Sequence, residues 1–206
     1  MWTFEDEKRN QGYTYICGVD EAGRGPLAGP VYAAAVILPS HINIQGLNDS
    51  KKLSAKKREE LYDEITSKAV SYGVAFADNF EIDELNILNA TYLAMNRAIA
   101  MLSPEPQISL IDGNRCTGIS YNSAAIVGGD GKSASIAAAS ILAKVSRDRF
   151  MEETAKKYPL YLFEKHKGYG TKLHYEKLIE YGPTEIHRRS FIKKVLNDGN
   201  NGNKKT

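Results

Sequence analysis

The sequence predicts a mixed α/β fold, in which helices pack on a β-sheet. Its 206 residues suffice for one domain with a buried core. Apolar residues make up 42% and charged residues 25% of the chain, a composition typical of globular proteins rather than of disordered chains or coiled coils. β-prone runs come first and then alternate with segments of helical periodicity. This order indicates a mixed sheet with helices against it.

The predicted strands are short apolar or β-branched runs bounded by turn residues. The first two are joined by the glycine-rich segment 22–30, so we expect them to form an antiparallel hairpin. Acidic residues follow three of the runs, a feature that bears on function below. The five runs are residues 13–19, 31–38, 72–77, 108–111 and 124–127.

Four segments are predicted to be helical. Ser54 is expected to cap a helix that reaches about Ala69. From Asp83, apolar residues recur at alternating spacings of three and four up to Pro104, which predicts one continuous apolar stripe. The alanine-rich segment 133–157 and the segment 171–181 complete the set. The stripe consists of Leu85, Leu88, Tyr92, Met95, Ile99 and Leu102.

We expect residues 1–192 to form a single domain, whose part from about residue 160 is basic and helical. Residues 193–206, nearly all Asn, Gly and Lys from Asp198 onward, are expected to be a flexible tail. The apolar run from Val31 to Leu38 is far shorter than the roughly 20 residues of a membrane helix. The first residues lack the pattern of a secretory signal, so the sequence predicts a cytoplasmic protein without a membrane partner. Cys17 and Cys116 are expected to be reduced.

Charge is divided unevenly along the chain. Residues 1–139 hold 12 basic and 17 acidic residues, whereas residues 140–206 hold 15 basic and 8 acidic ones. A basic C-terminal third is typical of a protein that grips a polyanion with one part and performs cation-dependent chemistry with another. Charge alone is equally compatible with a solvated basic surface.

Carboxylates follow three of the predicted strands: Asp20 with Glu21, then Asp112, then Asp130. A single acidic residue there often only forms a turn or caps a helix. Because strands of one sheet bring their ends to a common edge, we expect the four carboxylates to converge, and their repulsion would require bound cations. An all-oxygen ligand set favours Mg²⁺ or Mn²⁺. The chemistry that this indicates is phosphodiester hydrolysis assisted by two metal ions.

Two glycine-rich motifs lie beside these carboxylates. Gly23-Arg24-Gly25 allows the backbone to approach a ligand closely, and Arg24 adds a donor for phosphate. The second motif, residues 128–133, ends in Gly-Lys-Ser like a P-loop. A P-loop also needs a glycine where this chain has Ile126, so a nucleotide-binding loop is excluded.

Six segments, in this order, resemble those of the bacterial ribonuclease HII family, over residues 15–192. The resemblance implies a ribonuclease H-like fold, a site of three aspartates and one glutamate, and cleavage of RNA that is embedded in or joined to DNA. It further implies products with 5′-phosphate and 3′-hydroxyl ends. The segments are GVDEAGRGPLAGPV (18–31), NDSKKL (48–53), IDGN (111–114), AASILAKVSRD (138–148), HKGYGT (166–171) and GPTEIHRRSF (182–191).

By motif, the resemblance places the metal ligands on Asp20, Glu21, Asp112 and Asp130. It assigns recognition of the ribose 2′-hydroxyl to Gly23-Arg24-Gly25. It also assigns to Tyr169 the sensing of an RNA-to-DNA junction, through packing of its ring under the sugar on the 3′ side of the ribonucleotide. Asp148 competes with Asp130 for the fourth ligand position; Asp130 is favoured because it follows a strand, whereas Asp148 lies within a helix beside two arginines.

The resemblance also suggests contacts with the phosphates of the substrate strands. Type II is favoured over the related type III enzyme, since only about 14 residues precede the first predicted strand. His166, His174 and His187 are expected to be structural. The predicted phosphate contacts are Ser50, Lys51, Ser140, Lys144, Lys167 and Arg188, with Lys52, Lys165, Lys172 and Arg189 as further basic candidates.

The leading interpretation is therefore a monomeric, metal-dependent endoribonuclease that removes misincorporated ribonucleotides and RNA primers. Its partners would be RNA/DNA hybrids or ribonucleotide-containing duplex DNA, with a sliding clamp as a candidate protein partner. Two alternatives are a catalytically silent hybrid-binding module and a phosphate-binding ATPase or kinase. The first would be favoured by a missing ligand carboxylate, and the second would need a complete P-loop.

Overall fold

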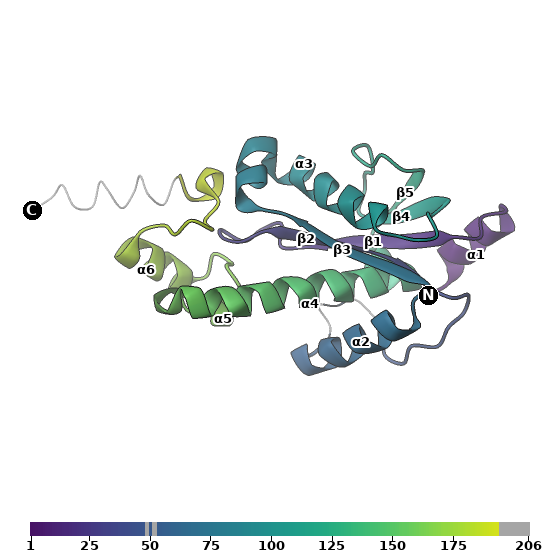
Figure 1. Ribbon diagram of the computed structural model, residues 1–206, viewed down its shortest axis with the longest axis horizontal. Helices are drawn as coiled ribbons and strands as arrows, with labels where there is room; N and C mark the ends of the chain where they lie inside the picture. Colours follow the sequence, from purple (N-terminus) through teal and green to yellow (C-terminus); the bar gives the residue numbers. More distant parts are fainter. Residues whose placement is uncertain (48–49, 51–52, 194–206) are drawn as a thin grey trace, which may run out of the picture.

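A five-stranded mixed sheet forms the centre of the protein, with helices on both faces (Figure 1). The computed structural model describes residues 1–47, 50 and 53–193. The strand order is β3-β2-β1-β4-β5; β1 pairs antiparallel with β2 and parallel with β4, which pairs parallel with β5. The strands are β1 (Ile16–Ala22), β2 (Val31–Ile37), β3 (Ser71–Ala77), β4 (Ile108–Asp112) and β5 (Ser123–Ile126).

The predicted strands and the hairpin are confirmed, with one shift in the first strand. Because β1 begins at Ile16 and continues to Ala22, Asp20 and Glu21 lie inside the strand rather than after it. Val19 is opposite Ile111 in the parallel register between β1 and β4. That register brings Asp20 next to Asp112, which is the last residue of β4.

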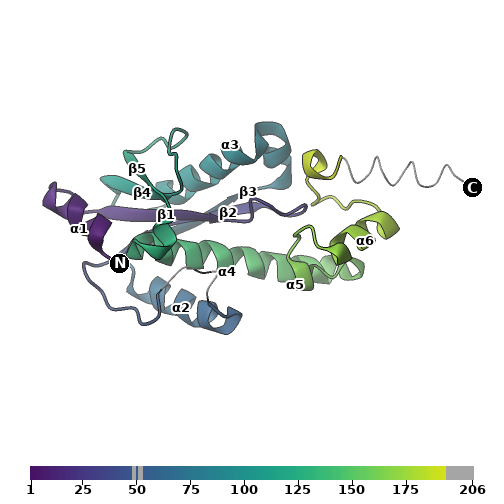
Figure 2. The same ribbon diagram turned by 180° about the vertical axis from the view of Figure 1, so that it is seen from behind.

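The two sheet faces are covered by α3 on one side and by α4 on the other, with α2 packed against α4 (Figures 1 and 2). Each interface is an apolar core of buried aliphatic side chains. Gly18 allows α4 to approach β1 closely, since a Cβ there would lie 2.1 Å from the carbonyl carbon of Ser135. The helices are α1 (Thr3–Asn10), α2 (Ala55–Lys68), α3 (Asn79–Ala100), α4 (Ala134–Lys157), α5 (Phe163–His166) and α6 (Lys172–Tyr181).

The capping predictions hold for α2, where the Ser54 side chain accepts from the amide of Lys57. The continuous stripe predicted for α3 is wrong at its start. Asn86 has a φ of 67°, and its Oδ1 accepts from the amides of Leu88 and Asn89, at 3.0 and 3.2 Å. The asparagine therefore breaks the helix and caps its second half. Leu85 and Leu88, placed on the inner face by periodicity, are each 37% exposed.

Helix α1 was not predicted. It contributes the buried side chain of Glu5. Its Oε1 accepts hydrogen bonds from the amide of Ser135 at 2.9 Å and from the hydroxyl of Ser135 at 2.7 Å. The same oxygen accepts from the hydroxyl of Ser133 at 2.6 Å. Since Ser133 is the N-cap of α4, these contacts fix the N-terminal segment to the beginning of that helix.

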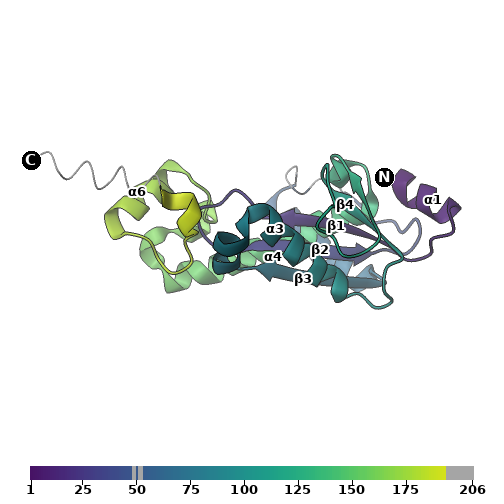
Figure 3. The ribbon, with the colours of Figure 1, turned by 90° about the horizontal axis from the view of Figure 1, so that it is seen from above.

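The C-terminal part forms a compact group of short elements at the far end of α4, opposite to α1 (Figure 3). It consists of the 3₁₀ turn η3 (Pro159–Tyr161), α5 and α6. Leu27 to Gly29 bind it through their backbone: Leu27 donates to Gly168, Gly29 donates to Ile186, and Arg188 donates to Leu27, at 2.8 to 2.9 Å. This part therefore packs directly against the turn that follows β1.

Both cysteines are free thiols, as predicted. Within the described ranges, no helix has the length and apolar character required to cross a membrane. The tail predicted for residues 193–206 lies outside the described residues from 194 onward.

Candidate active site

Three aspartates meet at one edge of the sheet. Asp20 comes from β1, Asp112 from the end of β4, and Asp130 from the 3₁₀ turn η2 (Gly129–Gly131) that follows β5. One carboxylate oxygen of each lies within 4.8 Å of the others. The parallel pairing of β1, β4 and β5 causes this convergence, because it brings the carboxyl ends of the three strands to the same edge.

Asp20 is the most deeply placed of these carboxyl groups, with 4% of its surface exposed. Burial, and then the negative charges of Glu21 and Asp112, raise its pKa well above the usual range. Hydrogen bonds from the Ser140 side chain and from the Glu21 amide, the latter at 2.7 Å, oppose that rise. The cluster is thus costly in its fully ionised form, which is the property expected of a site that binds cations.

Asp112 also organises the turn that carries Asp130. Its Oδ1 accepts from the amide of Gly129 at 2.6 Å, so the end of β4 is joined to η2. On the other side of η2, the amide of Ser133 donates to the Gly129 carbonyl at 2.8 Å. The position of Asp130 is therefore fixed from β4 and from the cap of α4.

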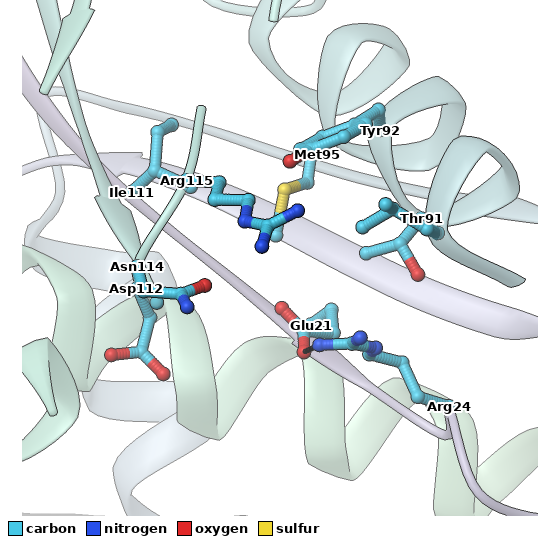
Figure 4. A pocket seen from close by; sticks show the side chains of 11 residues that line it. Glu21, Arg24, Thr91, Tyr92, Met95, Ile111, Asp112, Asn114 and Arg115 are labelled. Carbon is cyan, nitrogen blue, oxygen red and sulfur yellow. Dashed lines mark hydrogen bonds and ion pairs between the residues drawn. The ribbon is translucent and has the colours of Figure 1, made fainter. Parts of the chain in front are cut away.

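Glu21 lies beside this cluster and pairs with Arg24, whose guanidinium is 3.4 Å from Glu21 Oε1. Figure 4 shows this pair in a pocket toward which Thr91, Tyr92 and Met95 project from α3. The structure thus groups three of the four predicted ligands, and Glu21 as the fourth remains a prediction.

The competing candidate, Asp148, belongs to an ion-pair network that joins α4 to α2. Its carboxylate is 2.6 Å from Lys144 Nζ and 3.8 Å from the Arg58 guanidinium. The interpretation of Asp148 as a structural ion pair is confirmed, although with these partners rather than with its neighbouring arginines. The grouping of Asp130 with Asp20 and Asp112 favours Asp130 as the ligand.

A second pocket lies next to Asp20 and gathers most of the predicted substrate-binding residues. Ser50 and Ser140 are buried in it, with their hydroxyl oxygens 2.9 Å apart. Lys144 reaches it while paired with Asp148. Lys51 lies outside the described residues. The pocket is lined by Asp20, Glu21, Ala22, Gly23, Arg24, Gly25, Ser50, Ser140, Lys144 and Tyr169.

Gly23 and Gly25 occupy different surroundings in this pocket. Gly23 has a φ of +96°, and a Cβ there would lie 2.0 Å from Nε of Arg147. A Cβ on Gly25 would lie 4.0 Å from Cε1 of Tyr169, whose residue is 41% exposed. Gly25 and the partly exposed Tyr169 ring thus face each other and line one slot of this pocket.

The prediction that Arg188 contacts a strand phosphate is wrong for this structure. Arg188 is fully buried, and its guanidinium donates to the backbone carbonyls of Gly23, Arg24 and Gly29 at 2.6, 2.8 and 2.9 Å. It therefore holds the glycine-rich turn in place from below. The sequence could not predict this, because the motif around Arg188 does not distinguish an exposed arginine from a buried one.

Lys167 is likewise engaged with protein: its Nζ is 2.7 Å from a carboxylate oxygen of Glu152. Arg147 is a residue that sequence reasoning missed. It is buried and donates to the carbonyls of Pro30, Ala28 and Lys167 at 3.2, 3.3 and 3.0 Å, with its guanidinium 5.5 Å from the centre of the Tyr169 ring. Arg147 thus joins the turn after β1 to the segment that carries Tyr169.

The mixed sheet with an acidic cluster at the carboxyl ends of its parallel strands defines a hydrolase of the ribonuclease H class. The crystal structure of ribonuclease H2 from Pyrococcus horikoshii OT3 is similar, with a TM-score of 0.74 and 28% identity over 91% of this chain and 99% of that one. The ribonuclease HII in a complex with PCNA from Archaeoglobus fulgidus has a TM-score of 0.70 and 26% identity, over 85% of this chain and 94% of that one.

Sequence comparison identifies the family. The family model for ribonuclease HII matches residues 17–194. A ribonuclease HII from Caldicellulosiruptor bescii is 59% identical over 192 residues, which cover 93% of this chain and 93% of the relative. The chain therefore belongs to the ribonuclease HII family. The expected fold and class of enzyme are confirmed, and the silent binding module and the ATPase are set aside.

Proposed function

We propose that this ribonuclease H cuts the phosphodiester on the 5′ side of a ribonucleotide, within RNA/DNA hybrids and at RNA-DNA junctions in duplex DNA. The products would carry 5′-phosphate and 3′-hydroxyl ends, and the biological role would be removal of misincorporated ribonucleotides and RNA primers. One observation carries the proposal: a single pocket joins the buried carboxyl group of Asp20 to Gly23-Arg24-Gly25 and to the Tyr169 ring.

The donor set of the acidic cluster fits a divalent cation. Asp20, Asp112 and Asp130 offer oxygen atoms only, at mutual distances short enough for shared ligation, and Asp20 is destabilised as a free carboxylate. These residues, with Glu21, would hold Mg²⁺ or Mn²⁺. When bound, such ions supply an activated water and stabilise the leaving oxygen.

The chain's own residues provide selectivity for the ribose. Backbone groups of Gly23 to Gly25 would bind the 2′-hydroxyl, since a site built to hydrogen-bond a hydroxyl rejects a substrate that lacks it. Tyr169 would support the next sugar, and Ser50, Ser140 and Lys144 would contact the phosphates that pass through the pocket. Residues 1–192 would act as one catalytic domain. A sliding clamp is proposed as a partner because a structurally similar ribonuclease HII forms a complex with PCNA.

A cleavage assay tests this function. The substrate is a duplex with one embedded ribonucleotide, incubated with and without Mg²⁺ or Mn²⁺, and the cut is mapped to the nucleotide. We expect a single cut on the 5′ side that requires the metal, and none in the matched all-DNA duplex. A cut at another position, or equal cutting of the all-DNA duplex, would contradict the proposal.

A further inference from the structure

Three buried histidines form one cluster beneath Tyr169. His166 and His174 stack with their ring centres 4.4 Å apart, and His174 lies 3.0 Å from His187 between their Nε2 atoms. His174 and His187 have no exposed surface, and His166 is 6% exposed. The side chains of Phe163 and Tyr161 enclose the rings. None of the three histidines lines the pocket that we propose for the substrate.

The hydrogen bonds of the cluster define where each proton lies. Nδ1 of His187 accepts from the amide of Thr184 at 2.9 Å, so a neutral His187 carries its proton on Nε2. That proton points at Nε2 of His174, which must then be the acceptor. His174 consequently carries its own proton on Nδ1 and donates it to the carbonyl of Tyr169 at 3.0 Å.

The relay ends on the residue whose ring forms one side of the slot. The Tyr169 carbonyl also accepts from the amide of Thr171, and the Tyr169 amide donates to the His166 carbonyl, each at 2.8 Å. The backbone of Tyr169 is therefore held by short local contacts and by one side chain that reaches it from α6. Since the ring itself is partly exposed and contacts Arg147 on one side, its orientation toward Gly25 depends on that contact and on how firmly this backbone is held.

We propose that His174 is a positioning residue for Tyr169, and that His187 acts through it by fixing its tautomer. The hydrogen bond from His174 to the Tyr169 carbonyl fixes the backbone of Tyr169 and so keeps its ring facing Gly25 in the pocket. This inference rests on the proposed function, because it takes Tyr169 to be the residue that senses a junction. It adds two residues, neither of which touches the substrate, to the determinants of junction preference.

Two substitutions at His174 separate this role from plain packing. His174→Phe keeps a ring against His166 but removes the donor, whereas His174→Asn keeps a donor near the position of Nδ1 and removes the ring. We expect His174→Phe to lower kcat/KM by about fivefold to tenfold at an RNA-to-DNA junction, the size of one lost hydrogen bond, and to leave cleavage within an all-RNA strand nearly unchanged. His174→Asn should recover most of the loss at the junction.

Leu61→Ala is the matched control, since Leu61 is buried in α2, away from the slot. It should lower the Tm without changing the ratio of kcat/KM between the two substrates. If His174→Phe behaves as this control does, or if His174→Asn restores nothing, the positioning role is refuted.

Tyr169→Ala distinguishes a failure of the proposed function from a failure of the inference about His174. Without a selective loss at the junction in this variant, the assignment of Tyr169 in the proposed function fails. A selective loss there, but not in His174→Phe, overturns only the inference about His174. Nitrogen chemical shifts of the histidine rings give a readout that needs no substrate: we expect the proton on Nδ1 of His174 and on Nε2 of His187, and the opposite tautomers would overturn the relay.

Discussion

The histidine cluster makes stability depend on pH in a predictable direction. Burial mainly, and the neighbouring His166 to a smaller extent, lower the pKa of His174 from the ordinary 6.5 to about 4. An unfolded chain therefore binds a proton on this ring below about pH 6.5, whereas the folded protein does so only near pH 4. The stability that comes from keeping His174 neutral is complete above the unfolded pKa and is lost as the pH falls through this window.

The size of the effect follows from the two pKa values. Between about pH 7 and about pH 5, the loss is roughly 2 kcal/mol for His174, because each pKa unit corresponds to about 1.4 kcal/mol. His187, whose pKa is lowered to about 3 first by burial and then by His174, changes stability in the same direction. Asp20 acts with the opposite sign, since its raised pKa favours the folded state as the pH falls.

A comparison of two proteins isolates the histidine. The free energy of unfolding in urea is measured at the two pH values for the wild type and for His174→Asn, which cannot titrate, both without divalent ions. We expect the variant to be less stable at neutral pH, and the gap to shrink by about 2 kcal/mol at the lower pH. The two other histidines of the cluster, His166 and His187, are present in both proteins. Parallel pH profiles would refute the reasoning.

Three further predictions concern the site. At saturating Mg²⁺, Asp130→Asn should lower kcat by at least about a thousandfold, whereas Asp148→Asn should mainly lower the Tm; the reverse pattern would exchange their roles. Gly23→Ala should lower the rate of cleavage at an embedded ribonucleotide, because the new Cβ would displace Arg147. Gly12→Ala is the control: Gly12 has the same φ of +96° but open space around it, so this variant should keep its activity. Equal losses in both variants would show that backbone strain alone is the cause. Arg188→Lys should reduce kcat/KM on that substrate and leave the salt dependence of binding unchanged, and a flatter salt dependence would show a direct phosphate contact after all.

The fold was largely predictable because its elements follow local rules. The Ser54 cap predicted α2, and alanine-rich composition predicted α4, each to within a residue or two. The error in α3 has a local cause that periodicity does not represent. A single side chain, that of Asn86, satisfies two amides of the following turn and so makes a left-handed residue stable within an apparently regular stripe. Helix α1 was missed because its docking depends on Glu5, a charged residue that is buried only through contacts with α4.

The acidic cluster was predictable for a different reason, which is topological. Once β1, β4 and β5 are strands of one sheet, their ends must meet, so the residue types that follow them define the chemistry. No such rule applies to Arg147 and Arg188. Their positions in the sequence say nothing of burial, and their partners are backbone carbonyls of the turn after β1 and of Lys167, which any residue could supply.

The charge of the C-terminal third has a consequence that only the structure reveals. Several lysines among its described residues pair with glutamates, as in Lys167 with Glu152 and Lys177 with Glu180, and surface pairs of this kind contribute little to stability. The two buried arginines instead donate to backbone carbonyls, which satisfy their hydrogen bonds without cancelling their charge. Two guanidinium groups therefore lie against the glycine-rich turn, next to the pocket that we propose for the substrate. Composition therefore predicted the excess of positive charge, but not that two of these charges are buried against the glycine-rich turn.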